Sequence, residues 1–171
     1  MIISDRSHGE GIPFDVLMPG DFFMRYGETG DDSYCMKVRE IERKYSEPAN
    51  TLRLGNGKML HLYKGRRVFK LRAEIVTEDI NRGIPREGEN GETEWAGFQF
   101  AALIPGELFL EPGKEESYCM RIKETELADG RTVNAIHLGT MKLMRMFEDQ
   151  KVYLVHATLV VESVVEGKEE V

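Results

Sequence analysis

The octapeptide SYCMKVRE (residues 33–40) returns 84 positions later as SYCMRIKE (residues 117–124), and each copy holds one of the two cysteines of the chain. A reactive cysteine pair, a metal site and a repeated structural unit would each explain this recurrence. Each explanation predicts different surroundings for the octapeptide, so the flanking sequence decides which fold to expect.

The similarity continues well beyond the octapeptide. Residues 11–23 (GIPFDVLMPGDFF) align with residues 97–109 (GFQFAALIPGELF), and residues 50–76 align with residues 134–160 without a gap. Aligned in full, residues 11–28 with 97–114 and residues 33–76 with 117–160 share 20 identical residues over 62 positions. Agreement of this length predicts an internal repeat, which must be recognised before any fold is assigned. The cysteines then recur because a whole unit recurs.

The repeat divides the chain into five parts. We predict an N-terminal tail (1–10), a first module (11–76), a linker (77–96), a second module (97–162) and a charged C-terminal tail (163–171). The linker is rich in glycine and glutamate and contains a proline, which is typical of connecting segments. We expect its aromatic residues Trp95 and Phe98 to pack the two modules together.

Apolar residues alternate with polar ones in both modules. Tyr34, Met36 and Val38 would lie on one face of a strand, with polar residues between them. This period of two indicates half-buried antiparallel strands. Five such strands in about 65 residues cannot bury both faces of a flat sheet. We therefore predict an all-β fold of two tandem, homologous small five-stranded β-barrel or β-roll modules.

A hairpin is expected in each module where the pattern reverses. A loop of three to four residues suits both copies, and in the first module a three-residue loop after Leu54 would place Leu52, Leu54, Leu60 and Leu62 on one face of the sheet. The same loop length in the second module gives the same agreement, which favours it.

The layout PGDxF, YxMKV, LxxG and VxxxxA, read from Pro19 to Ala73, resembles small uncharacterised β-barrel modules found in tailed-phage genomes. The resemblance covers most of both modules. It implies a phage origin, and it implies no activity and no catalytic residue.

The usual signs of catalysis and metal binding are missing from the sequence. Zinc sites need about four ligands at short spacings, and no CxxC or HxxxH pattern occurs. Nothing basic recurs beside both cysteines to activate a thiol. The four histidines have no histidine counterpart in the other module. We therefore predict free thiols at Cys35 and Cys119, no metal, no cofactor, no catalytic residue and no enzymatic activity.

The charge is unevenly distributed. The chain carries a formal net charge of -7, which argues against a general nucleic-acid binder. Residues 35–76 nevertheless carry 11 basic and 4 acidic residues. We predict a basic face on the first module that either binds an anionic partner or is simply solvated. Its candidate residues are Lys37, Arg39, Arg53, His61, Lys64, Arg66, Arg67, Lys70 and Arg72.

The second module has lost most of this charge. A more apolar strand face there suggests protein contact. The candidate interface residues are Val152, Leu154 and Val160, together with Trp95 and Phe98 of the linker.

These observations favour a non-enzymatic binding protein. It could be a phage accessory factor that binds a host macromolecule, or an anionic ligand such as a nucleotide or nucleic acid. The alternative is a structural or assembly component of a virion, in which the duplicated barrels act as a pseudo-dimer. Homo-oligomerisation stays open. No signal peptide or membrane-spanning segment is visible, so a cytoplasmic location is expected, in the host if the chain is phage-encoded.

Overall fold

The described part of the chain is built from β-strands and two short 3-10 helices. The computed structural model describes residues 11–25, 28 and 33–165, so the predicted N-terminal tail lies outside it. The first half contains β1 (Ile12–Pro13), β2 (Phe22–Arg25), β3 (Tyr34–Ile41), β4 (Ala49–Arg53), β5 (Lys58–Leu60) and β6 (Arg67–Asn81). The second half contains β9 (Phe98–Gln99), β10 (Leu108–Leu110), β11 (Cys119–Glu126), β12 (Thr132–His137), β13 (Leu143–Met144) and β14 (Lys151–Val164). The prediction of an all-β fold is confirmed.

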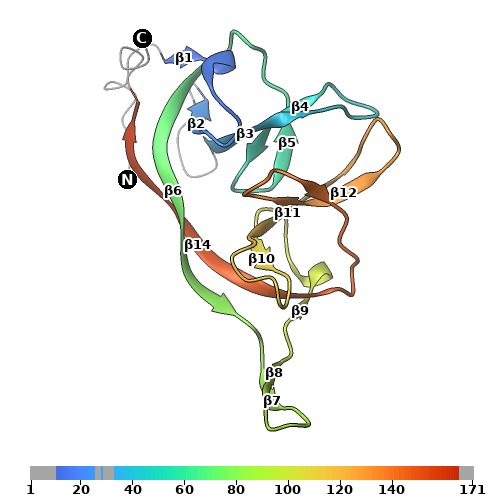
Figure 1. Cartoon of the computed structure of the whole chain (residues 1–171). Helices are drawn as coiled ribbons and strands as arrows, with labels where there is room; N and C mark the ends of the chain where they lie inside the picture. The colour runs from blue at the N-terminus through green and yellow to red at the C-terminus, as the bar shows by residue number, and fades with distance from the viewer. Residues whose placement is uncertain (1–10, 26–27, 29–32, 166–171) are drawn as a thin grey trace.

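Shorter elements complete the two halves. The 3-10 helices η2 (Phe14–Val16) and η4 (Phe100–Ala102) follow β1 and β9 at corresponding places. A hairpin of β7 (Pro85–Glu87) and β8 (Thr93–Trp95) lies between the halves and projects away from the rest of the molecule (Figure 1). An ion pair between Arg86 and Glu94, with 2.9 Å from Nε to Oε2, joins its two strands.

Apart from β7 and β8, the described strands form one 12-stranded sheet rather than two closed barrels. Its order is β13-β12-β11-β10-β14-β6-β2-β3-β4-β5, with β1 also paired to β6 and β9 to β14. The predicted pair of tandem barrels is therefore not confirmed. The reason is the length of β6 and β14, which run together as a long curved ribbon (Figure 1). Each pairs with its own half near its start and with the other long strand along the rest.

The pairing of β6 with β14 relates the two halves by an approximate two-fold axis. Ile75 pairs with Leu159, which is its own counterpart in the repeat. The ladder shifts register beside Glu78 and again beside Glu162, and these two residues are also counterparts. The antiparallel ladder thus brings each long strand against the matching stretch of the other.

Two boundaries differ from those that the sequence predicts. Residues 77–81, assigned to the linker, continue β6, because the pairing with β14 extends to Asn81. Residues 163–164, assigned to the C-terminal tail, end β14, and residues 166–171 lie outside the described part.

Hydrophobic packing joins the halves through a shared central core. Buried residues of both halves meet there, including Leu52, Met59, Ile122 and Ile136. Each half also has its own smaller core under its 3-10 helix, centred on Phe23 or Phe109. The linker aromatics do not build the central core, since Trp95 and Phe98 are only half-buried and pair with Pro85 and Val152. The predicted packing through them is therefore wrong.

The structure explains why the octapeptide recurs. Cys35 and Cys119 are free thiols, both buried, as the sequence predicts. Each sulfur lies close to the carbonyl oxygen two residues before it, at 3.5 Å from Ser33 and 3.6 Å from Ser117. The cysteines therefore fill equivalent places under the two 3-10 helices, and this role accounts for their repetition.

The hairpin loops contain four residues, which lies within the predicted range but is one more than the favoured three. Arg53 pairs with Lys58, and the backbone N–H of His137 donates to the carbonyl of Lys142 at 2.8 Å. The extra residue moves the side chains of the second strand to the opposite face of the sheet, so that Leu52 pairs with Met59.

Candidate anion-binding site

Lys37 is used inside the protein rather than at a charged surface. Its Nζ donates to the carbonyl oxygens of Phe14 at 3.2 Å and Leu17 at 2.6 Å, and it lies 4.6 Å from the centre of the Phe14 ring. Burial lowers the pKa of Lys37, against the opposing effect of nearby carboxylates. The residue fixes η2 to β3, so its predicted role in facing an anionic partner is wrong.

The second half shows the same arrangement with arginine. Nη1 of Arg121 donates to the carbonyl oxygens of Phe100 at 2.7 Å and Leu103 at 2.6 Å, with its guanidinium group 4.6 Å from the Phe100 ring centre. Positive charge at this position therefore serves the fold of both halves and marks no binding site.

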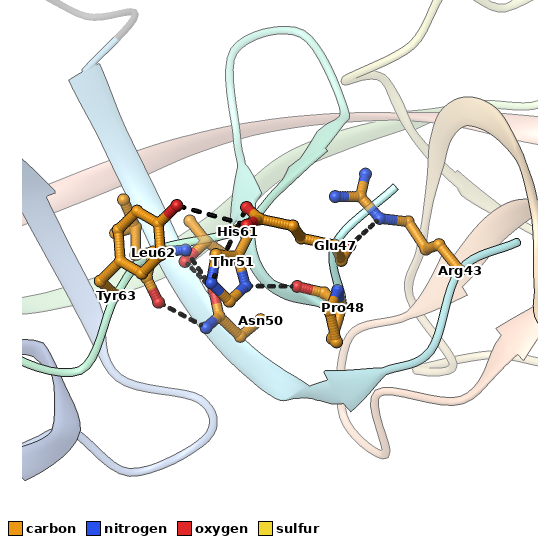
Figure 2. Close-up of polar contacts among 8 residues, drawn as sticks. All are labelled: Arg43, Glu47, Pro48, Asn50, Thr51, His61, Leu62 and Tyr63. Atoms are coloured by element: carbon orange, nitrogen blue, oxygen red, sulfur yellow. Dashed lines mark hydrogen bonds and ion pairs between the residues drawn. The ribbon is translucent and has the colours of Figure 1, made fainter. Parts of the chain in front are cut away.

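His61 lies in a polar network of its own (Figure 2). Its Nδ1 is 2.7 Å from the carbonyl oxygen of Pro48, and its Nε2 is 4.0 Å from Oε2 of Glu47. The ring packs edge-on against Tyr63, whose hydroxyl donates to Glu47 at 3.3 Å. A carboxylate beside the imidazole disfavours an incoming anion, so His61 does not fit the predicted basic face.

The remaining basic candidates lie at or near the surface. Lys70 is partly buried, with its Nζ 3.6 Å from Oδ2 of Asp21. Arg67 is exposed and donates to the carbonyl oxygen of Gly11 at 3.3 Å. The other exposed members are Arg39, Lys64, Arg66 and Arg72.

Three arginines from separate segments of the first half lie close together. Arg25 ends β2, Arg53 ends β4, and Arg66 directly precedes β6. Pairing of Arg25 with Val68 sets it beside the start of β6, and pairing of Arg53 with Cys35 sets it across the sheet from β2. We call Arg25, Arg53 and Arg66 the arginine cluster.

One carboxylate within the described residues links two members of the arginine cluster. Nη2 of Arg25 contacts Oε1 of Glu28, and Nη2 of Arg53 lies 3.4 Å from its Oε2. The Arg25 and Arg53 side chains are 20% and 21% exposed, so both can be reached from solvent. Their Nε atoms are buried and have no acceptor within the described part of the chain. The cluster therefore holds more donors and more positive charge than Glu28 satisfies.

The electrostatic environment of Arg25 reflects this crowding. Burial lowers the pKa of Arg25 most, and repulsion from Arg53 and Arg66 lowers it further. Like charges held this close favour a bound anion that offsets them. Sequence reasoning missed Arg25 because this residue lies before residue 35, outside the stretch of excess basic charge.

The corresponding positions of the second half carry different chemistry. They hold Glu111, His137 and Gln150. His137 accepts from the backbone N–H of Thr140 at 3.0 Å and shares a hydrogen bond with Ser117 at 2.8 Å. The alignment of the repeat could have revealed this difference, because it places each arginine opposite its counterpart.

The two cysteines respond to these different surroundings. Burial raises the pKa of Cys35, and the neighbouring Arg25 and Arg53 oppose that rise. Burial raises the pKa of Cys119 to about 11, and Glu111 adds to the effect. Both thiols stay protonated near neutral pH, which does not suit a nucleophile.

The predicted protein-interface residues of β14 differ in how deeply they are buried. Val152 is fully buried in the core of the second half, so it cannot contact a partner. Leu154 is half-buried against the same core, and Val160 is 41% exposed. Of the strand residues, only Val160 is thus well placed for contact.

Metal binding and membrane crossing have no support in the described part of the structure. No group of three or more histidine, cysteine, aspartate or glutamate side chains within it could hold a metal ion. No helix in this part of the chain has the length and apolar character needed to cross a bilayer.

Comparison with known proteins returns no match. No family model matches the chain, and neither the curated proteins nor the solved structures contain a significant relative.

Proposed function

We propose that this chain is a non-enzymatic binding protein that takes an anionic group at the arginine cluster. The observation that carries the proposal is the grouping of Arg25, Arg53 and Arg66, of which Arg25 and Arg53 share the carboxylate of Glu28. Guanidinium groups offer paired N–H donors that match phosphate and carboxylate oxygens. A phosphate or carboxylate group is therefore the chemistry that the cluster fits best.

The surroundings of the arginine cluster support this proposal. Arg66 is exposed, and its exposed neighbours Lys64 and Arg67 extend the positive surface. Exposed charges of one sign draw in a ligand of the opposite sign, while partly buried ones are less screened by salt. Arg66 would thus attract the anion, and Arg25 and Arg53 would hold it.

Glu28 sets the strength of binding, because an arriving anion must compete with its carboxylate for Arg25 and Arg53. The Glu28→Gln variant should therefore bind more tightly than the wild type. Tighter binding would distinguish this site from a generally basic surface, on which removal of one carboxylate has only a small effect.

Isothermal titration calorimetry with pyrophosphate, at constant ionic strength, tests the proposal. We expect one binding event, weakened about tenfold or more by Arg53→His or Arg66→Gln, which install the residues of the second half. Gln150→Ala is the matched control and should bind as the wild type does. Absence of binding to the wild type, or equal binding by all variants, would refute the proposal.

We further infer that the two halves arose by tandem duplication of one module. The shared order of strands, the paired counterparts Ile75 and Leu159, and the matched positions of Glu78 and Glu162 support this inference. The phage origin and the alternative role in virion assembly stay predictions. Mass in solution at low and physiological salt separates the assembly role from the binding role, since a salt-sensitive polymer favours assembly and a salt-insensitive monomer or dimer favours binding.

A further inference from the structure

A pocket separate from the arginine cluster lies between the two halves. Its volume is about 370 Å³, a size typical of sites for small organic molecules. Side chains from both halves line it, and most are apolar. They include Tyr34, Leu54, Ile75, Leu108, Met120 and Leu159. The pocket therefore offers an apolar surface beside the long ribbon of β6 and β14.

The two halves of the repeat differ in the residues beside this pocket. The turn that contains Gly57 lies against Gly106, a lining residue, so closely that a Cβ on Gly57 would come within 2.7 Å of the Gly106 nitrogen. The counterparts of these residues are Met141 and Gly20. The Cε atom of Met141 would lie 3.3 Å from a Cβ on Gly20. A methionine side chain thus lies beside the glycine on one side of the axis, whereas on the other side the two glycine backbones pack directly against each other.

An acidic pocket adjoins the apolar one. Its volume is about 270 Å³, and it shares Gly106, Leu108 and Ala157 with the first pocket. Glu78 and Glu107 line it, together with His156. One hydrogen bond to each carboxylate is described: the hydroxyl of Thr158 donates to Glu78, and the backbone N–H of Ile104 donates to Glu107 at 3.1 Å. Each carboxylate keeps further acceptor capacity.

We propose that the joined pockets bind a small organic cation with an apolar body, of the primary alkylammonium class. The alkyl chain would lie against Ile75, Leu108 and Met120. The ammonium group would lie at the acidic pocket, where its three donors meet the carboxylates of Glu78 and Glu107. Charge complementarity selects this head group, because the two carboxylates outnumber the one imidazole of His156.

Methionine methyl NMR of the full chain, titrated with hexylammonium chloride, tests this site without any substitution. Met120 lines the apolar pocket, while its counterpart Met36 does not. We expect the Met120 methyl signal to shift with saturation and the Met36 signal to stay in place. Hexanoate, the matched anion, should bind about tenfold more weakly. An unmoved Met120 signal, or equal affinities for both probes, would overturn the proposal.

Two sets of variants define which part of the site acts on which part of the probe. Ala157→Leu should fill the junction of the pockets and abolish hexylammonium binding, whereas the same change at its counterpart, Ala73→Leu, should leave binding intact. The double variant Glu78→Gln with Glu107→Gln should still bind the alkyl chain of the probe. It should no longer bind hexylammonium more tightly than hexanoate. Wild-type affinity in Ala157→Leu, or an unchanged preference in the double variant, would contradict the assignment.

Discussion

In the first half, Arg25 and Arg53 contact Glu28 and the charge of Arg66 lies near Arg25, while the corresponding positions of the second half hold Glu111, His137 and Gln150. The residues that shape the backbone differ far less. Lys37 and Arg121 both hold a 3-10 helix through two carbonyl oxygens. Within one chain, therefore, the second half serves as an internal control. Features present in both halves build the fold, and features present in one are candidates for function.

The largest effect should come from the shared central core and should be equal in both halves. Leu52 and Ile136 are counterparts, and both are fully buried in it. Leu52→Ala and Ile136→Ala should each lower the free energy of unfolding by about 2–5 kcal/mol, measured by urea denaturation. A large cost in one half with almost none in the other would show that the halves do not share a core.

Loss of a buried asparagine should also cost the two halves equally. Asn50 bonds both backbone groups of Leu62 at 2.8 Å, and Asn134 does the same to Met146 at 2.9 and 2.7 Å. Asn50→Ala and Asn134→Ala each leave backbone groups unpaired, so each should cost about 1–3 kcal/mol in urea denaturation. If only one variant were destabilised, the equivalence of the two hairpins would be disproved.

The pH dependence of stability should separate the two cysteines. A thiol whose pKa is higher in the folded state keeps its proton where the unfolded chain has lost it, so stability falls as pH rises above about 9. The fall continues toward pH 11 for Cys119, whose pKa is raised to about 11. In thermal melts from pH 8 to 11, Cys119→Ser should flatten this decline more than Cys35→Ser does. The reverse order would contradict the roles given to Glu111 and to the two arginines.

The smallest effect on stability is expected where the halves differ in function. Arg66 is exposed, so Arg66→Gln should change the free energy of unfolding by less than about 0.5 kcal/mol, as should the opposite change, Gln150→Arg. Chemical denaturation of both variants measures this. A large loss for Arg66→Gln would mean that the arginine cluster is structural.

Much of the local structure could be predicted from the sequence. The alternation around Met36 predicts the strand that forms β3, and the repeat predicts the same strand at β11. The prediction of closed barrels failed because a period-two pattern identifies a strand without showing which other strand it pairs with. The second part of β6 looks like any half-buried strand, and only the three-dimensional pairing with β14 shows that its partner is the other half.

The candidate site could be predicted only in part. Arg53 and Arg66 belong to the basic stretch, and the alignment shows that the second half replaces both. Lys37 could not be excluded from sequence, because an outward strand position looks solvated until η2 folds over it. The same cover buries Cys35, which alternation alone would place at a polar face.

The arginine side-chain Nε–H signals test the central claim most directly. The Nε atoms of Arg25, Arg53 and Arg121 are all buried without an acceptor within the described residues, and Arg121 belongs to the second half. In a ¹H–¹⁵N NMR titration with pyrophosphate, the Arg25 and Arg53 signals should shift together while the Arg121 signal stays unchanged. If none of the three signals moved, or if Arg121 moved as far as the others, the claim that only the first half binds an anion would be wrong.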